Sequence, residues 1–101
     1  MDSKIKGYLG LAARIRKIET GERASLSIRN KKAKCCVLAE DCGENAKKKI
    51  QDKCAFYEIE LVYVNSREEL SLALGKANSP YVTITDEGIA KQILKRNKEV
   101  I

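Results

Sequence analysis

Histidine and tryptophan are absent from this 101-residue chain, and proline occurs once, as Pro80. Without histidine, the chain lacks the side chain that most often serves as a general base near neutral pH. No run of 18 apolar residues is present, which excludes a membrane-spanning helix. The first ten residues lack the long apolar segment of a secretory signal. We therefore expect a cytoplasmic protein without a membrane partner.

Catalytic motifs are also missing. The six glycines are scattered, so no glycine-rich phosphate loop is present, and neither G-x-S-x-G nor H-E-x-x-H occurs. One carboxylate pair, Glu40 and Asp41, follows a predicted strand, where metals and substrates often bind. The alternative is that Asp41 begins a turn and Glu40 is solvated. We expect a protein that is not an enzyme and needs no cofactor.

The four cysteines are Cys35, Cys36, Cys42 and Cys54. They form no C-x-x-C pair, and without histidine they do not match the usual ligand sets of structural zinc. A cytoplasmic protein keeps such thiols reduced. In a strand, Cys35 and Cys36 would point to opposite faces and fill the core as small apolar groups.

Positive charge is concentrated in the first half of the chain. Twenty Lys and Arg residues oppose fourteen Asp and Glu residues, a formal net charge of +6. Residues 1–53 hold fourteen of the basic and seven of the acidic residues. This distribution favours a surface that faces a polyanion. A solvated basic surface that only keeps the protein soluble is the alternative.

The order of apolar patterns predicts an α/β fold. Helical spacing occurs at residues 4–16, 21–31, 45–57 and 66–76 and after Asp86, and strand-like runs occur at 17–20, 35–40, 61–64 and 81–85. The runs at 35–40 and 61–64 read as buried strands. We predict a single domain, residues 1–101, folded as a three-layer α/β/α sandwich with a roughly four-stranded mixed sheet.

Several local details follow from the same patterns. The first helix would bury Tyr8, Leu11 and Ile15, and the second helix a weak stripe that includes Leu26. The charged tail at 96–101 is expected to fray. Side chains that could cap the five helices are Ser3, Thr20, Asn45, Ser66 and Asp86.

The segment KIETGER, residues 17–23, is the first candidate binding site. A helix that begins near Gly21 presents free backbone N–H groups and a positive dipole end, which accept a phosphate or a base edge. Arg23 can donate two hydrogen bonds to either group, and Glu22 can accept from a base amine. The alternative is an ordinary capped helix start with a solvated arginine. Nearby cations that would extend this surface are Lys17, Arg29, Lys31, Lys32 and Lys34.

Two further segments are weaker candidates. In NSPY, residues 78–81, Tyr81 could stack on an unpaired base, or could be a core or edge tyrosine. The three lysines at 47–49 could hold phosphates, or could form a solvated helix face.

The chain resembles the L7Ae/L30e superfamily of kink-turn-binding ribosomal proteins, in particular the bacterial YlxQ-type ribosomal-like proteins. The matching segments are LGLAARIRKIETGE at 9–22, AKCCVLAEDCGENAKKKIQDKC at 33–54, SREELSLALGK at 66–76 and VTITDEGIAKQIL at 82–94. They cover nearly the whole chain in the family's order.

The resemblance implies a sheet between helices and an RNA site made by residues 20–24, 40–43 and 78–81. The helix start would contact the guanine edges of a sharply bent RNA internal loop, lysines would hold its backbone, and no reaction would take place. The RNA-binding residues expected on this basis and from the charge pattern are Lys17, Thr20, Gly21, Glu22, Arg23, Lys31, Lys32, Lys34, Asn78, Ser79, Pro80 and Tyr81.

The chain departs from the family pattern at the helix start. The family often has G-x-N-E followed one turn later by lysine, whereas this chain reads GERASLS. Arg23 and Ala24 stand where the family has Asn and Glu, and Leu26 or Ser27 stands where it has lysine. Two hypotheses remain. The first is a monomeric protein that binds structured RNA of kink-turn type, in association with the ribosome. The second is a protein-interaction module that has kept the fold and lost kink-turn recognition.

Overall fold

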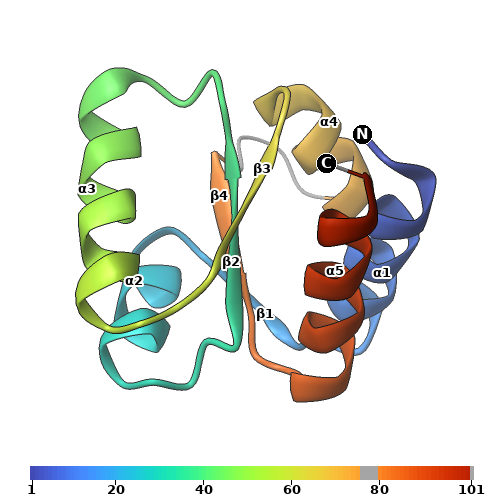
Figure 1. Ribbon diagram of the computed structural model, residues 1–101, viewed down its shortest axis with the longest axis horizontal. Helices are drawn as coiled ribbons and strands as arrows, with labels where there is room; N and C mark the ends of the chain where they lie inside the picture. Colours follow the sequence, from blue (N-terminus) through green and yellow to red (C-terminus); the bar gives the residue numbers. More distant parts are fainter. Residues whose placement is uncertain (76–79, 101) are drawn as a thin grey trace.

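Four strands of the described chain form one mixed sheet. The computed structural model describes residues 1–75 and 80–100. Its strands are β1 (Ile18–Thr20), β2 (Cys35–Ala39), β3 (Leu61–Val64) and β4 (Tyr81–Ile84). They lie in the order β1-β4-β2-β3, with β2 parallel to β3 and β4 antiparallel to β1 and β2. The starts of β1, β2 and β3 therefore lie at the same end of the sheet as the end of β4, which we call the lower end, as it is drawn in Figure 1.

Helices cover both faces of this sheet (Figure 1). α1 (Ser3–Arg14), α4 (Arg67–Leu74) and α5 (Glu87–Val100) lie on one face, and α2 (Gly21–Arg29) and α3 (Glu44–Phe56) on the other. The predicted α/β/α sandwich with a four-stranded mixed sheet is confirmed. Within residues 1–75 and 80–100, no helix is both long and apolar enough to cross a membrane.

Two apolar cores fill the spaces between the layers. Cys35 belongs to the core beneath α1, α4 and α5, and Cys36 to the core beneath α2 and α3. The prediction that these two side chains point to opposite faces of the sheet is confirmed, as expected for neighbouring strand residues. All five residues of β2 are buried. β3 lies at the border of the sheet with Tyr63 43% exposed, so the prediction of a second fully buried strand is wrong.

The buried face of α1 also differs from the prediction. Ile5, Leu9 and Ala12 point into the core, whereas Leu11 and Ile15 are more than 40% exposed. Both sets have helical spacing, because residues three and four apart share a face. The position of the helix on the sheet selects one of them.

Two helix starts use other caps than predicted. The carboxylate of Asp2, rather than the hydroxyl of Ser3, accepts hydrogen bonds from the backbone nitrogens of Lys4 and Ile5 at 3.1 Å each. α3 begins at Glu44 after Gly43, whose φ of 95° suits glycine, so Asn45 is inside the helix. The predicted caps Ser66 and Asp86 are confirmed by hydrogen bonds to the backbone nitrogens three residues further on.

The last helix does not fray as predicted. α5 continues to Val100, and the guanidinium of Arg96 donates two hydrogen bonds, of 3.0 and 3.1 Å, to the carboxylate of Asp2. This bidentate pair joins the two ends of the described chain.

Candidate nucleic-acid interface

The candidate site is organised by the start of α2. Thr20 precedes the helix in an extended conformation, and its side chain makes no capping hydrogen bond, so its predicted cap is wrong. Gly21 has a φ of +60°, a backbone conformation that residues other than glycine rarely adopt. A Cβ at Gly21 would meet nothing within 4 Å, so the glycine is required by backbone conformation and leaves open space beside the helix start.

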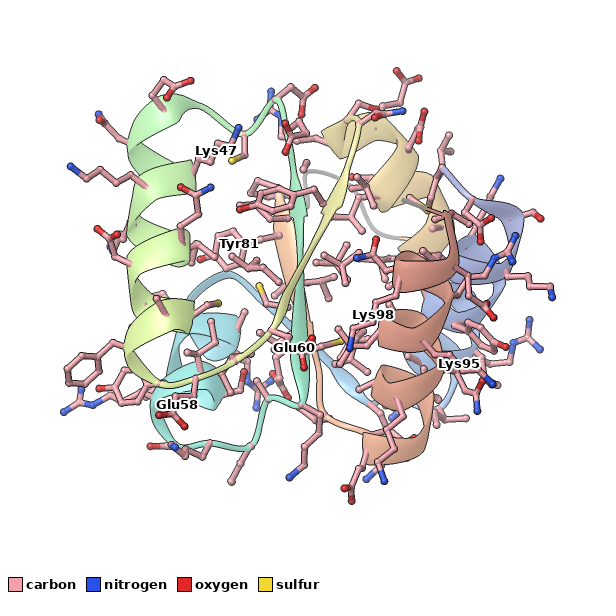
Figure 2. The ribbon with its side chains drawn as sticks, viewed as in Figure 1. Lys47, Glu58, Glu60, Tyr81, Lys95 and Lys98 are labelled. Atoms are coloured by element: carbon pink, nitrogen blue, oxygen red, sulfur yellow. The ribbon has the colours of Figure 1, made fainter. Side chains whose placement is uncertain are left out.

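Tyr81 supports this helix start from β4. Its hydroxyl donates a hydrogen bond to the carbonyl oxygen of Gly21 at 3.2 Å. The ring is partly buried against the core beneath α2 and α3, and it lies between the sheet and α3 in Figure 2. This burial, with smaller contributions from Cys36 and Glu22, raises the pKa of the phenol. Tyr81 thus lies at the edge of a core, which is one of the two alternatives that the sequence allowed for this residue.

Arg23 projects from the first turn of α2 into solvent. Its side chain is 84% exposed, and its Nε lies 3.5 Å from Oε2 of Glu19. Exposed pairs of this kind contribute little to stability, typically about 0–1 kcal/mol. Arg23 therefore remains free to exchange this partner for a phosphate or a base edge, and Glu22 beside it is exposed as well.

Two later residues of this helix, Ala24 and Ser27, turn inward. Ala24 is fully buried and Ser27 is 4% exposed. The Ser27 hydroxyl lies 2.7 Å from the carbonyl oxygen of Ala24 and 2.7 Å from the hydroxyl of Thr83 in β4. Leu26, predicted to be buried, is instead 52% exposed. Of the two residues that could stand in place of the family's lysine, Ser27 thus supports the sheet and Leu26 faces outward.

A groove of about 640 Å³ runs along the outward side of α2, beside the border strand β1. Six cations and one carboxylate line it, together with four uncharged residues. The lining residues are Arg16, Lys17, Glu19, Arg23, Leu26, Ser27, Asn30, Lys31, Lys32, Lys34 and Thr85. All four lysines predicted to hold phosphates are therefore gathered in one place.

The ends of two helices bring these cations together. After α1, the backbone nitrogens of Arg16 and Lys17 bond back to the carbonyls of Ala13 and Ala12, and Lys31 and Lys32 make the same pair of bonds after α2. This is the Schellman arrangement, in which the residue after the cap takes a positive φ. Here the cations also face the negative ends of the two helix dipoles.

The predicted set of RNA-binding residues lacks six lining residues, Arg16, Glu19, Leu26, Ser27, Asn30 and Thr85. Arg16 stands next to a predicted cation and could have been found from its position just after a helix. Leu26 was included in a weak apolar stripe with Ala24 and Ile28, although residues two apart do not share a helix face. Nothing in the sequence marks Asn30, which is the C-cap of α2.

The loop after β2 is held by its own carboxylates. Oδ1 of Asp41 accepts a hydrogen bond from the backbone nitrogen of Arg67 at 2.8 Å, at the start of α4. Oε2 of Glu40 lies 3.4 Å from Nζ of Lys47. Among residues 1–75 and 80–100, no group of three His, Cys, Asp or Glu side chains is placed to hold a metal ion. The two carboxylates therefore connect β2 to the helices that follow.

The three lysines at 47–49 do not form one surface. Lys47 points back toward the sheet (Figure 2), pairs with Glu40, and has its ammonium 6.0 Å from the centre of the Tyr63 ring. Lys48 and Lys49 are exposed on the far side of α3. Only these two remain available as solvated or phosphate-binding charges.

Three of the four thiols have raised pKa values. Burial raises the pKa of Cys35 to about 12, and a hydrogen bond with Cys54 together with burial raises that of Cys36. Burial also raises the pKa of the partly exposed Cys42. The same hydrogen bond with Cys36 lowers the pKa of Cys54, which is itself buried in the core.

Only part of the segment before β4 belongs to the described residues. Asn78 and Ser79 lie outside the described residues. Pro80 is half-buried, and its carbonyl oxygen accepts a hydrogen bond from the backbone nitrogen of Ala39 at 2.9 Å. With the bond from Tyr81 to Gly21, the described part of this segment, residues 80–81, therefore lies beside the end of β2 and the start of α2.

Comparison with known proteins identifies related chains. Residues 3–94 match the model of the ribosomal protein L7Ae/L30e/S12e/Gadd45 family. The chain is 40% identical over 87 residues to the RNA-binding protein YlxQ of Bacillus subtilis (strain 168), covering 85% of this chain and 87% of that protein. It is 38% identical over 99 residues to the RNA-binding protein YlxQ of Enterococcus faecium, covering 97% and 91%.

Solved structures share the fold. A protein with unknown function from Bacillus halodurans C superposes with a TM-score of 0.90 at 32% identity, covering 96% of this chain and 99% of that one. The Giardia lamblia 15.5kD RNA binding protein superposes with a TM-score of 0.79, covering 100% and 93%. The latter is only 14% identical, so it demonstrates a common fold alone.

Proposed function

Because this chain belongs to the ribosomal protein L7Ae/L30e/S12e/Gadd45 family, as its sequence resemblance predicted, we propose that it binds structured RNA and performs no reaction on it. The observation that carries the proposal is the groove beside α2, where six cations accompany a single carboxylate. Cations in such a density neutralise phosphates, which supply most of the affinity of proteins for nucleic acids. Two relatives, from Bacillus subtilis (strain 168) and Enterococcus faecium, bear the name RNA-binding protein.

We propose a division of labour within this site. Gly21, Glu22 and Arg23 would meet exposed base edges at the start of α2, because the first turn of a helix offers N–H groups and a positive dipole end. The lysines of the groove, Lys17, Lys31, Lys32 and Lys34, would hold the sugar–phosphate backbone and fix its orientation. In this arrangement Tyr81 positions the helix start through its bond to Gly21.

The proposed target is a kink-turn, as in the family that the chain resembles. Hydrogen bonds from Tyr81 to Gly21 and from Ala39 to Pro80 join residues 80–81 to the start of α2 and to the end of β2, which supports a site shared by these three elements. A bent RNA could contact all three at once, whereas a straight duplex could not. Association with the ribosome is part of the same proposal.

A gel-shift titration tests this proposal with a kink-turn RNA and a straight duplex of equal length. We expect the kink-turn to bind at least tenfold more tightly, and both affinities to fall steeply with salt as counterions are released. Equal affinity for the two RNAs would remove the kink-turn target and leave binding to the phosphate backbone. Absence of any shift would remove RNA binding.

A second candidate function is protein interaction without kink-turn recognition. The residues at positions 24 and 27 favour it, since Ala24 and Ser27 are buried and carry neither the carboxylate nor the ammonium that the family has at this helix start. Affinity capture from a lysate, with and without ribonuclease treatment, separates the two functions. Partners that survive nuclease treatment support protein interaction, and partners that are lost support RNA binding.

A further inference from the structure

The groove beside α2 contains two residues that phosphate binding does not require. Its cations account for a polyanion, but its lining also includes the carboxylate of Glu19 and the exposed side chain of Leu26. A carboxylate repels phosphate, and an isobutyl group gains nothing from it. Both residues therefore need a different part of the ligand.

Leu26 supplies an apolar surface inside a charged groove. Its side chain is 52% exposed and lies outside both cores of the sandwich. Single exposed leucines are common on protein surfaces. This one, however, lies between Arg23 in the first turn of α2 and Asn30 at its end, where a planar apolar face could be covered. In single-stranded nucleic acids, the unstacked base presents such a face.

Glu19 supplies a hydrogen-bond acceptor beside that surface. Its side chain is about one-third exposed, and the guanidinium of Arg23 at 3.5 Å orients the carboxylate. An ionised carboxylate only accepts hydrogen bonds, and one ion pair leaves lone pairs free. The matching donors on a nucleotide are the amino groups of bases, such as the 4-amino group of cytosine. Uracil has a carbonyl at that position and cannot donate there.

We propose that the groove beside α2 holds an unpaired nucleotide of the bound RNA, with its base on Leu26, its amino group on Glu19 and its phosphates on the surrounding cations. This inference rests on the proposed function, because it assumes that RNA is the ligand. The groove, at about 640 Å³, has the size of a site for a small organic group, about 300–1,000 Å³. The site would therefore prefer a base with an amino edge over uracil.

Fluorescence anisotropy with labelled ten-nucleotide oligocytidine and oligouridine tests this preference. The two strands have the same backbone charge, so their electrostatic attraction to the protein is equal and only the bases differ. We expect wild-type protein to bind oligocytidine more tightly than oligouridine by roughly tenfold or more, as one hydrogen bond to a charged group would give. Glu19→Gln should abolish the preference, because an amide can both donate and accept.

Leu26→Ala should weaken binding of both strands by roughly fivefold or more, since each kind of base covers the apolar side chain with its ring face. The matched control is Leu72→Ala, which truncates a leucine that is 70% exposed on α4, on the other face of the sheet. Its affinities should equal those of the wild type. Both variants change solvent-exposed residues, so thermal unfolding should confirm that they remain folded.

Equal binding of the two oligomers by the wild type would overturn the inference. So would unchanged affinity of Leu26→Ala or an unchanged preference of Glu19→Gln. If the protein binds the kink-turn RNA in the gel-shift titration but gives one of these three results, only the nucleotide site fails and the proposed function stands. If no RNA of any kind binds, the proposed function fails as well.

Discussion

At the scale of single residues, two cations of the groove have a strained backbone conformation. Arg16 and Lys31 have φ values of 60° and 59°, and Glu58 at the end of α3 has 58°. This conformation costs a residue other than glycine about 1–2 kcal/mol. The chain thus keeps charged residues at three helix ends where glycine would be more stable.

Replacing Lys31 by glycine should therefore separate stability from binding. We expect Lys31→Gly and Glu58→Gly each to raise the free energy of unfolding by about 1 kcal/mol in urea denaturation. Only Lys31→Gly should also weaken RNA binding, because Glu58 lies outside the groove. A gain in RNA affinity for Lys31→Gly would contradict the role of this lysine.

Arg23 is the residue most exposed to a ligand at the helix start. Arg23→Ala should weaken binding to the kink-turn RNA by about 1–3 kcal/mol, as expected when a direct contact to a base or phosphate is lost. Stability should hardly change, because the side chain is 84% exposed and its ion pair is weak.

The control for Arg23→Ala is Lys91→Ala. Lys91 belongs to another exposed i,i+4 ion pair, with Glu87 on α5, on the other face of the sheet. A similar loss of RNA affinity in both variants would mean that only the total charge matters.

At the scale of helices and strands, the sequence predicts identity and order but not orientation. The run at 35–40 and the alternation of apolar segments were sufficient for β2 and for the layered fold. The face of α1 was wrong, because Leu11 and Ile15 have the same helical spacing as Ile5 and Leu9, and the choice depends on the sheet.

The candidate site was predicted in part, for a similar reason. The cations Lys17 and Lys31 could be selected from charge alone, and the structure places them in one groove. The outward position of Leu26 depends on Ser27, whose hydroxyl turns toward Thr83 and so fixes the rotation of α2. A contact between residues 56 positions apart leaves no local pattern in the sequence.

The contact between Ser27 and Thr83 gives a prediction for α2. Ser27→Ala or Thr83→Val alone should lower the free energy of unfolding by about 1–2 kcal/mol, because each leaves a buried hydroxyl with one partner fewer. The double variant should lose less than the sum of the two. Urea denaturation of all four proteins measures this coupling, and simple additivity would show that the hydroxyls do not interact.

The pair that joins α1 to α5 gives a prediction for pH. Hydrogen bonds from Arg96 and from the backbone hold the pKa of Asp2 below its ordinary value. A lowered pKa contributes stability above the ordinary value and loses it as pH falls through the folded value. We expect Asp2→Asn, which can still cap α1, to be less stable than wild type at neutral pH.

The difference between wild type and Asp2→Asn should shrink below about pH 4. Thermal unfolding between pH 2 and pH 7 measures it, with Asp52→Asn on the exposed side of α3 as control. A difference that stays constant over this range would mean that the ion pair does not stabilise the fold.

At the scale of the whole molecule, two of the cavities are lined by groups of cations. The groove beside α2 gathers cations from the ends of α1 and α2 and from the approach to β2. A second set, Lys91, Lys95 and Lys98, lies along α5 around a cavity that also contains Glu60 and Glu99. Figure 2 shows Lys95 and Lys98 on α5, across the sheet from α3. Substitutions at either place can therefore lower the net charge of the protein by the same amount, while only one of them changes the groove.

Affinity for the kink-turn RNA in two triple variants tests the central claim most directly. Lys17, Lys32 and Lys34 are changed to glutamate in one, and Lys91, Lys95 and Lys98 in the other. Each change lowers the charge by two, so both variants fall from +6 to zero. We predict that the groove variant loses binding, roughly a hundredfold or more, while the α5 variant stays within about threefold of wild type at 150 mM salt. Equal losses in the two variants would contradict a binding site in the groove.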